Sequence, residues 1–320
     1  MESLTHTPNT DHSEWNESYY LCFADPKTNI RGMSRIGFKT NKSEGMAFLF
    51  LFFPDGSAAG YHTTEPIVNY NNPFTVGEMK HEYLQDGRWQ YTFNGTMIAV
   101  DNPLNFPEVK TKPELIKGLK DVNLKLSFQS LSEIYEYSKF MTKESLELGK
   151  KSGDEHWEQV AHISGDITVD DKKYLLSNVM GQRDHTHGIR DWTGVGNWLY
   201  YVVWFNDHLA INPAAIIAND GRLSTGGFLF KDGKNIPLKT IKILEERFDK
   251  SGIYPESSVL EIVDWNEDKH LLKGQVGPIL PIPFKDKEGE STLIQAFGTF
   301  ELDGIGGGFG TFETLRRKRK

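Results

Sequence analysis

Cysteine is almost absent from this sequence, and so are long apolar segments. Cys22 is the only cysteine among 320 residues, which excludes a disulfide bond within the chain. The longest apolar run, residues 46–53, is far shorter than the roughly 20 residues that a membrane-spanning helix needs. The first residues also lack the basic and then apolar stretches of a secretory signal. These absences predict a soluble, cytoplasmic protein without a transmembrane segment.

Positive charge is in deficit as well. Lysine and arginine total 36 against 44 aspartate and glutamate residues, which gives a formal net charge of −8 at pH 7. This balance argues against a nucleic-acid partner. The basic cluster of residues 316–320 stands at the end of the sequence, where we expect a solvated tail. The oligomeric state stays open at this stage.

Helical periodicity is scarce too, whereas the alternation typical of strands is frequent. Apolar side chains fall on every second position in residues 89–93 and 124–128. Pro54, Asp55 and Gly56 separate two β-prone runs, as in a hairpin turn. Many short strands with little helix predict an all-β protein, and the length suits two antiparallel β-barrels or sandwiches in tandem.

Residues 131–153 interrupt the strand pattern because they are charged and rich in lysine and glutamate. We expect a short helical or irregular linker there, and with it the domain boundary. The predicted organisation is a flexible arm (residues 1–14), a first barrel (15–150), a second barrel (151–315) and a basic tail (316–320).

Two familiar catalytic arrangements find no support. The glycine-rich residues 304–310 do not have the spacing of a dinucleotide-binding loop, and only ten residues follow them. Close packing of the backbone in a strand explains these glycines better. No serine lies in a G-x-S-x-G sequence, and Cys22 has no histidine near it in sequence. Covalent catalysis is therefore not indicated.

Residues 181–192, GQRDHTHGIRDW, concentrate groups suited to proton transfer. Two imidazoles stand beside carboxylates that can orient them and guanidiniums that can keep the carboxylates ionised. This is how a general acid is built. In an extended segment, Arg183, His185 and His187 share one face while Asp184 points to the other. The two histidines then face one space together.

The same segment can instead serve as internal scaffolding. Gly181 and Gly188 are expected at its turns, and arginine–carboxylate pairs buried beneath Trp192 would stabilise a barrel without any catalytic role.

A metal site is a further alternative for this segment. His185 and His187 are spaced as adjacent ligands on one face of a strand, and Asp191 follows four residues later, close to the metal motif of cupins. Cupins normally have glutamate there, and their second motif is not found downstream. Because the ligand set is incomplete, we expect no bound metal.

The segment resembles the pattern R-D-H-S-W-G-x-R-D-W of tandem lipocalin-like proteins related to carotenoid 1,2-hydratase, also called hydroxyneurosporene synthase. The matching residues are Arg183, Asp184, His185, Gly188, Arg190, Asp191 and Trp192. The likeness extends to WNESYY at residues 15–20, to GFGTFE at residues 308–313, and to Glu158, Gly165 and Val169. It therefore spans nearly the whole chain.

This resemblance implies two lipocalin-like β-barrels, a lipophilic substrate and no cofactor. Relatives include hydratases of isoprenoid double bonds and cyclases, so membership predicts the fold better than the reaction. The Ser-Trp of the family pattern is Thr186-His187 here. A second titratable group thus replaces an indole.

The favoured hypothesis is a cofactor-free acid–base enzyme, a hydratase, cyclase or isomerase of an isoprenoid-like or polyketide-like molecule. His185 is the expected proton donor, oriented by Asp184 or Asp191. His187 would assist it or position water, and Arg190 and Arg183 would fix the carboxylates. The aromatic residues expected to contact the substrate are Trp192, Trp198, Tyr200, Trp204 and Tyr20. The alternatives are a non-catalytic carrier of a hydrophobic molecule and a cupin-like metal-dependent enzyme.

Overall fold

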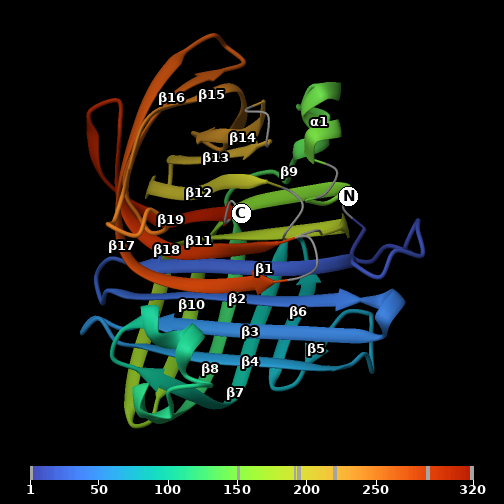
Figure 1. Ribbon diagram of the computed structural model, residues 1–320, viewed down its shortest axis with the longest axis vertical. Helices are drawn as coiled ribbons and strands as arrows, with labels where there is room; N and C mark the ends of the chain where they lie inside the picture. Colours follow the sequence, from blue (N-terminus) through green and yellow to red (C-terminus); the bar gives the residue numbers. More distant parts are fainter. Residues whose placement is uncertain are drawn as a thin grey trace. The chain divides into compact units, whose positions relative to one another are not determined.

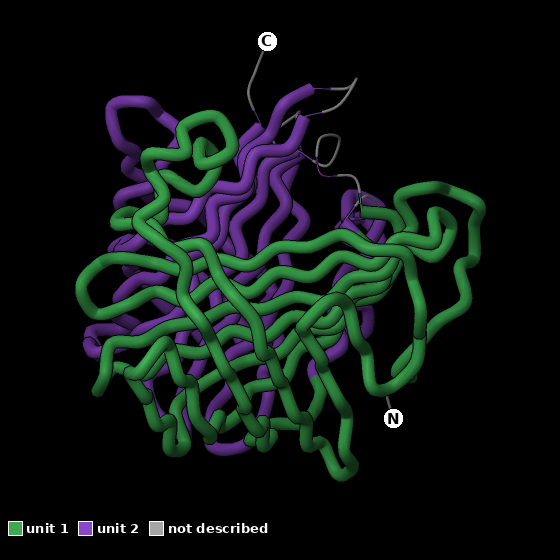
Figure 2. Tube along the Cα trace, turned by 90° about the horizontal axis from the view of Figure 1, so that it is seen from below, with its two compact units in different colours: residues 1–134, 153–190 green, residues 135–152, 191–320 purple. Residues whose placement is uncertain are grey.

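The computed structural model describes residues 3–149, 152–190, 192, 196–218, 222–285 and 289–317. The chain forms two compact units (Figure 2). Unit 1 comprises Met1–Ile134 and Gly153–Arg190, and unit 2 comprises Tyr135–Ser152 and Asp191–Lys320. Most described residues of both units lie in β-strands, which confirms the predicted all-β class.

Unit 1 is built around a ring of antiparallel strands. Their order is β4-β3-β2-β1-β11-β10-β8-β7, and β4 pairs with β7 through Ala58, Ala59 and Gly60, which closes the ring. The strands are β1 (Trp15–Asp25), β2 (Ile30–Lys39), β3 (Glu44–Phe52), β4 (Ala58–Pro66), β7 (Arg88–Val100), β8 (Ile116–Ser130), β10 (Glu155–Val169) and β11 (Lys172–Ile189). In Figure 1, β1 to β4 cross β7 and β8 steeply, as the two walls of a barrel do.

Shorter elements complete unit 1. The hairpin of β5 (Phe74–Val76) and β6 (Met79–Gln85) extends the sheet beyond β7. Three 3-10 helices lie between strands: η1 (Thr40–Lys42), η2 (Pro103–Glu108) and η3 (Pro113–Leu115).

Unit 2 contains a closed barrel in which each strand pairs with the next and the last pairs with the first. Its strands are β12 (Asn197–Asn206), β13 (Leu209–Ile217), β14 (Leu223–Lys231), β15 (Lys234–Phe248), β16 (Pro255–Asp264), β17 (Lys269–Lys285), β18 (Glu290–Leu302) and β19 (Ile305–Arg317). Gly308 and Gly310 lie inside β19, and a Cβ atom at Gly310 would stand 1.9 Å from the Val202 carbonyl oxygen. Close backbone packing therefore explains Gly310, as predicted, whereas no heavy atom lies within 4 Å of a Cβ placed at Gly304, Gly306 or Gly307.

The segment between the two strand-rich parts of unit 1 belongs to unit 2. It contains β9 (Tyr135–Glu136), η4 (Tyr137–Lys139) and α1 (Lys143–Gly149), so the short helix predicted within residues 131–153 is present. The Tyr137 hydroxyl donates to Asn212 Oδ1 at 2.8 Å, and Ser224 Oγ donates to the Ser145 carbonyl at 2.8 Å. These bonds fasten the segment to β13 and β14.

The predicted domain boundaries differ from the observed units. Residues 151–315 were expected to form the second barrel, yet β10 and β11 belong to unit 1. The reason is strand pairing, because β11 lies between β1 and β10, and β10 pairs in turn with β8. The segment carrying the His-rich motif thus closes the first barrel.

The two chain ends also differ from expectation. Residues 3–14 form neither strand nor helix, but Leu4 packs against the core of unit 1, and Asn41 Nδ2 donates to the carbonyl oxygens of Thr10 and His12 at 2.9 Å each. At the other end, Arg316 lies in β19 and pairs with Glu246 at 2.5 Å, so it is not part of a solvated tail. Residues 318–320 lie outside the described part of the chain.

The interior of unit 1 has a polar end and an apolar end. Tyr19, Leu21 and Phe23 point inward from β1 because side chains alternate along a strand. Directly opposite them on β11 stand His185, Arg183 and Gly181, in that order. The inward positions therefore change from charged and polar to apolar along the barrel axis.

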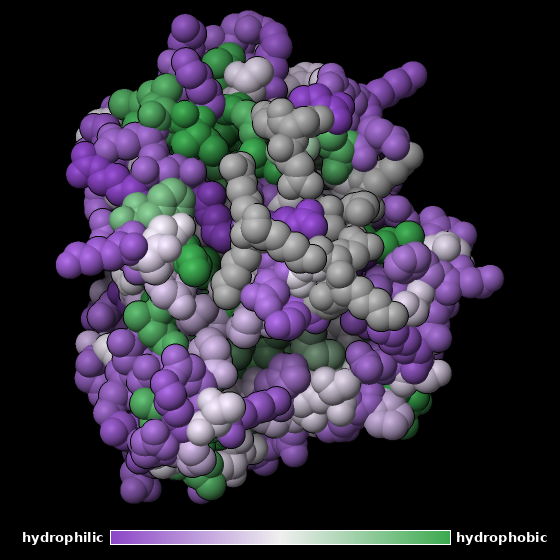
Figure 3. Space-filling view, viewed as in Figure 1, coloured by the Kyte–Doolittle hydropathy of each residue, from purple (hydrophilic) through white to green (hydrophobic). Residues whose placement is uncertain are grey.

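Unit 2 has an apolar interior formed by inward-facing residues such as Leu199, Tyr201 and Val203 of β12. No helix in the described ranges is both long and apolar enough to span a membrane. On the face shown in Figure 3, hydrophilic residues predominate and hydrophobic residues are interspersed among them.

Candidate active site

The motif lies on β11, and its side chains alternate as the sequence predicts. His185 stands opposite Tyr19 of β1 and Trp157 of β10, and all three point into the barrel of unit 1. His187 stands opposite Glu17 and shares this face. Asp184 points to the other face. The side chains of His185 and His187 therefore point into the same space, as predicted.

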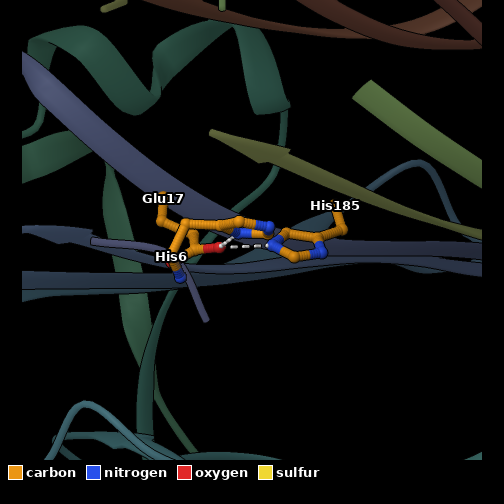
Figure 4. A group of neighbouring side chains, drawn as sticks. All are labelled: His6, Glu17 and His185. Carbon is orange, nitrogen blue, oxygen red and sulfur yellow. Dashed lines mark hydrogen bonds and ion pairs between the residues drawn. The ribbon is translucent and has the colours of Figure 1, made fainter. Parts of the chain in front are cut away.

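Glu17 is the centre of the inward-facing group. Its side chain has no exposed surface, yet both carboxylate oxygens accept two hydrogen bonds each. His185 Nε2 lies 2.7 Å and His6 Nδ1 lies 2.6 Å from Oε1 (Figure 4). The backbone N–H of His6 donates to Oε2 at 3.0 Å, and the Tyr70 hydroxyl donates to the same oxygen. Four donors compensate for the burial of a carboxylate.

Aromatic rings enclose this group. The His6 ring stacks on Trp157 with centroids 5.4 Å apart, and Trp157 lies 4.9 Å from the His185 ring. On its other side His185 stacks on Tyr19 at 4.6 Å, and Tyr19 stacks on Phe74 at 4.0 Å. The imidazole of His185 thus stands between two π faces, which attract a cationic ring or a cationic ligand.

His187 is a neutral imidazole beside this group. Burial, and then the charge of His6, lower the pKa of His187 to about 4. Its ring lies 4.0 Å from that of His6, and its Nδ1 is buried without a hydrogen-bond partner among the described residues. At neutral pH, His187 is therefore uncharged and can accept a hydrogen bond, for example from a water molecule.

Asp184 does not orient His185, contrary to the prediction. It belongs to a second group on the opposite face of β11, where His156 Nε2 lies 2.5 Å from Glu158 Oε1 and His156 Nδ1 lies 2.8 Å from Thr186 Oγ1. Burial, and then the charge of nearby Glu158, raise the pKa of Asp184 to about 6. Because the strand alternates, no rotamer of Asp184 reaches the inward side.

Two further predicted residues of the motif do not join the inward group. The charge of Arg190 acts on Asp184 and His156 of the second group, and it partly offsets the rise in the pKa of Asp184. Asp191, the other predicted partner of His185, lies outside the described residues. Among the described residues, the carboxylate that contacts His185 is that of Glu17.

The aromatic residues predicted to contact a substrate are not among those that point inward beside His185 in unit 1. Tyr20 stands opposite Asp184 on the face of β1 that points away from the interior. The other four belong to unit 2, where Trp192 stacks on Phe284 at 4.7 Å and Trp204 is fully buried. On β12 the inward positions are Leu199, Tyr201 and Val203, so Trp198, Tyr200 and Trp204 face outward.

Five residues around His185 and Glu17 were not predicted from the sequence: His6, Glu17, Tyr19, Tyr70 and Trp157. One signal was present in the segment WNESYY, where alternation puts Trp15, Glu17 and Tyr19 on one face of a strand. A carboxylate between two aromatic residues on an inward face needs buried partners. That signal pointed to Glu17, although not to its partners.

His6, Glu17 and His185 also form a group that could hold a metal ion, because their ligand atoms lie within 4.8 Å of one another. The direct contacts of 2.6 and 2.7 Å between nitrogen and oxygen are hydrogen-bond distances. An ion about 2.0–2.2 Å from each atom would need these atoms to stand farther apart. The arrangement therefore fits a shared proton better than a metal.

The sequence matches, over residues 2–318, the family model described as Domain of unknown function (DUF7064). The chain belongs to this family. Comparison with curated proteins gives no match.

Solved structures share the fold. A crystal structure from Nitrosomonas europaea, provisionally identified as AttH, has a TM-score of 0.65 and 12% identity, covering 95% of this chain and 93% of that chain. Kievitone hydratase from Nectria haematococca has a TM-score of 0.53 and 9% identity, covering 95% of this chain and 89% of that chain. At such identities the likeness concerns the fold of the whole chain.

Proposed function

We propose that unit 1 carries the active site of a cofactor-free acid–base enzyme of the hydratase type that acts on a lipophilic small molecule. The observation that carries this proposal is the enclosed pair of Glu17 and His185, 2.7 Å apart between aromatic rings. The similarity in fold to kievitone hydratase supports it. So does the resemblance of residues 183–192 to relatives of carotenoid 1,2-hydratase, the wider family in which we place this chain.

The proposed reaction is the addition of water to a carbon–carbon double bond. His185, protonated and stabilised by the Glu17 carboxylate, gives its proton to one carbon. The neighbouring carbon becomes cationic beside the aromatic rings that enclose His185, and their π electrons stabilise it. Water held by His187 then adds its oxygen there, and its surplus proton returns to the imidazole of His185. Cyclisation or isomerisation would begin with the same protonation.

Substitution of His185 tests this proposal. In His185→Gln, hydrogen bonding to Glu17 is retained while titration is lost, so we expect turnover to fall by about 10² to 10⁴ without loss of the fold. Glu17→Gln should act in the same direction, because a neutral amide no longer stabilises an imidazolium. The measurement is the appearance of the water adduct by mass spectrometry with a panel of isoprenoid and prenylated phenolic compounds.

His156→Gln is the matched control. It removes a partly buried imidazole whose Nε2 also contacts a carboxylate, at 2.5 Å, but on the outward face of the barrel wall. We expect it to leave turnover nearly unchanged. If His185→Gln and His156→Gln lost stability equally and neither altered conversion, the inward group would be scaffolding, and a carrier of hydrophobic molecules would be the better description.

Metal analysis tests the competing, cupin-like hypothesis. Because the His6 and His185 nitrogens contact Glu17 directly, we expect less than stoichiometric zinc, iron, nickel or manganese in protein purified without a metal-affinity tag. The measurement is elemental analysis of wild type beside His185→Ala. One metal ion per chain that disappears in His185→Ala would revive metal-dependent catalysis.

A further inference from the structure

The N-terminal segment, residues 3–8, enters the polar end of the unit 1 barrel without forming a strand or helix. The side chain of Leu4 packs against the apolar core of unit 1. The His6 ring lies among the inward-facing rings of Trp157, His185 and His187, at centroid distances of 5.4, 5.7 and 4.0 Å. The segment therefore contributes an apolar group and a polar group to the same enclosed space.

The backbone of this segment also binds groups of the candidate active site. The Tyr19 hydroxyl donates to the Leu4 carbonyl, and the Tyr70 hydroxyl lies 3.1 Å from the His6 carbonyl oxygen. The N–H of His6 donates to Glu17 at 3.0 Å. Two carbonyl acceptors and one N–H donor of this segment thus lie where a small molecule would meet His185.

Few contacts hold the segment elsewhere. The described residues 3–13 pair with no strand, and several of them are exposed. Asn41 Nδ2 holds the Thr10 and His12 carbonyls, and Asn9 Nδ2 donates to Asp154 at 3.1 Å. A segment without strand pairing and with exposed anchoring bonds opens at lower free energy than the barrel around it.

We propose that residues 3–8 occupy the ligand site of unit 1 in a closed state and that the ligand displaces them. The displacing ligand carries an apolar group in place of the Leu4 side chain and a neutral oxygen, such as an alcohol, ketone or phenol, in place of the peptide carbonyls. Tyr19 and Tyr70 recognise that oxygen. The Glu17 carboxylate disfavours a ligand carboxylate at the same place, because like charges repel.

This inference deepens the proposed function, since it concerns the same site, but it is tested by binding alone. The tethered segment competes with the ligand, so the apparent dissociation constant equals the intrinsic constant divided by the open fraction. Removing the segment removes the competition. Ligand affinity should therefore rise, whatever the truncation does to turnover.

The first experiment compares full-length protein with a chain lacking residues 2–8. The probes are retinol, which has a neutral oxygen, and diphenylhexatriene, which has none, and both are followed by fluorescence. We expect the truncated protein to bind retinol about tenfold or more tightly than the full-length protein does. In the truncated protein, Tyr19→Phe should weaken retinol binding about threefold to tenfold and leave diphenylhexatriene binding unchanged. Equal retinol affinity with and without the segment would overturn the proposal.

Asn41→Ala keeps the test valid if the truncated protein does not fold. It removes two exposed hydrogen bonds that anchor the segment and touches nothing inside the barrel. The matched control is Ser164→Ala, which also removes two hydrogen bonds, to Asn178 at 3.0 and 2.9 Å. Retinol affinity should rise in Asn41→Ala and stay constant in Ser164→Ala. If retinol affinity is unchanged in both variants, the proposal is contradicted.

Hydrogen exchange gives the direction of movement in the wild-type protein. The His6 amide is protected by its bond to Glu17, so displacement by retinol should speed exchange in residues 3–12. Slower exchange would mean that the segment closes over the ligand, which contradicts displacement. A failure of the proposed reaction can be told apart from a failure of displacement. If only the proposed reaction is wrong, retinol still displaces the segment, and His185→Gln leaves the conversion of substrate unchanged.

Discussion

Glu17 has no exposed surface, and what its carboxylate does depends on the donors around it. Removing one partner from a buried charge typically costs 3–5 kcal/mol, because the remaining charge is left uncompensated. His6, Tyr70 and His185 each supply a donor from a different part of unit 1. The same bonds that compensate for this burial hold His185 Nε2 in place. Stability and positioning are therefore coupled at this residue.

His81 provides a pH test at the residue scale. It is buried in the unit 1 core, its Nε2 lies 3.3 Å from Ser34 Oγ, and burial lowers its pKa from 6.5 to about 3. The native state therefore binds fewer protons than the unfolded state between these values, and stability is lost as pH falls below 6.5. At pH 5 this single group should cost about 2 kcal/mol.

His81→Gln should remove that share of the pH dependence. The free energy of unfolding, measured by urea titration at pH 7 and pH 5, should fall about 2 kcal/mol less in the variant than in wild type. The comparison uses the change between the two pH values, so any packing loss common to both cancels. An identical fall in both proteins would show that His81 is already protonated in the folded state.

For individual residues, the sequence predicted which way a side chain points better than it predicted which residues that side chain contacts. Alternation correctly placed His185 and His187 on one face and Asp184 on the other. The partner of His185 is 168 positions away, and no local pattern connects the two. Asp184, a carboxylate next to His185 in sequence, was therefore predicted as a partner instead. A strand brings opposite residues together only after its neighbour in the sheet is known.

At the element scale, β11 shows why the motif contains glycine. Gly181 and Gly188 were expected at turns, but both lie within β11. A Cβ at Gly181 would stand 2.4 Å from the Ile163 side chain, and a Cβ at Gly188 would stand 2.2 Å from the backbone nitrogen of Asp154. Both positions are glycine because another chain segment approaches closely, which a single sequence cannot distinguish from a turn.

Gly188→Ala should therefore be strongly destabilising. The φ of Gly188 is 121°, and the added methyl group would collide with backbone that cannot move aside easily. Gly118 in β8 is the control, since its φ is 148° and no heavy atom lies within 4 Å of its Cβ position. We expect Gly188→Ala to lose about 2 kcal/mol more than Gly118→Ala in thermal or urea unfolding. An equal loss of stability in the two variants would mean that the backbone near Asp154 shifts to accommodate the added methyl group.

Some elements follow from local sequence alone. Residues 198–205 are almost continuously apolar and were expected to form a strand covered on both faces. They lie in β12, where Leu199 and Val203 are buried in the interior and Trp198 and Trp204 are buried on the other face. The continuous apolar run was sufficient to predict this strand, because a strand that is buried on both faces carries apolar residues at every position.

At the scale of the whole molecule, the chain leaves unit 1 after Ile134 and returns at Gly153. A change in composition marks the segment between these two points, and this change was predicted to be the boundary between two consecutive domains. No sequence signal shows that β11 pairs with β1, because the pairing joins segments more than half the chain apart. Domains usually follow one another along the chain. Here unit 1 is made of two separate parts of the chain, and only the strand pairing shows this.

Fragments of the chain test this topology. A fragment of residues 1–150, the predicted first domain, contains β1 and β8 but lacks the two strands that lie between them. It leaves both edges unpaired and removes His185 from Glu17, so we expect no cooperative unfolding and a tendency to aggregate. A fragment of residues 1–190 contains every strand of unit 1 and should show near-ultraviolet circular dichroism and a single melting transition. Cooperative unfolding of the shorter fragment would mean that β1 and β8 can close a barrel without β10 and β11. In that case the His-rich strand would be an addition to the first barrel and not one of its walls.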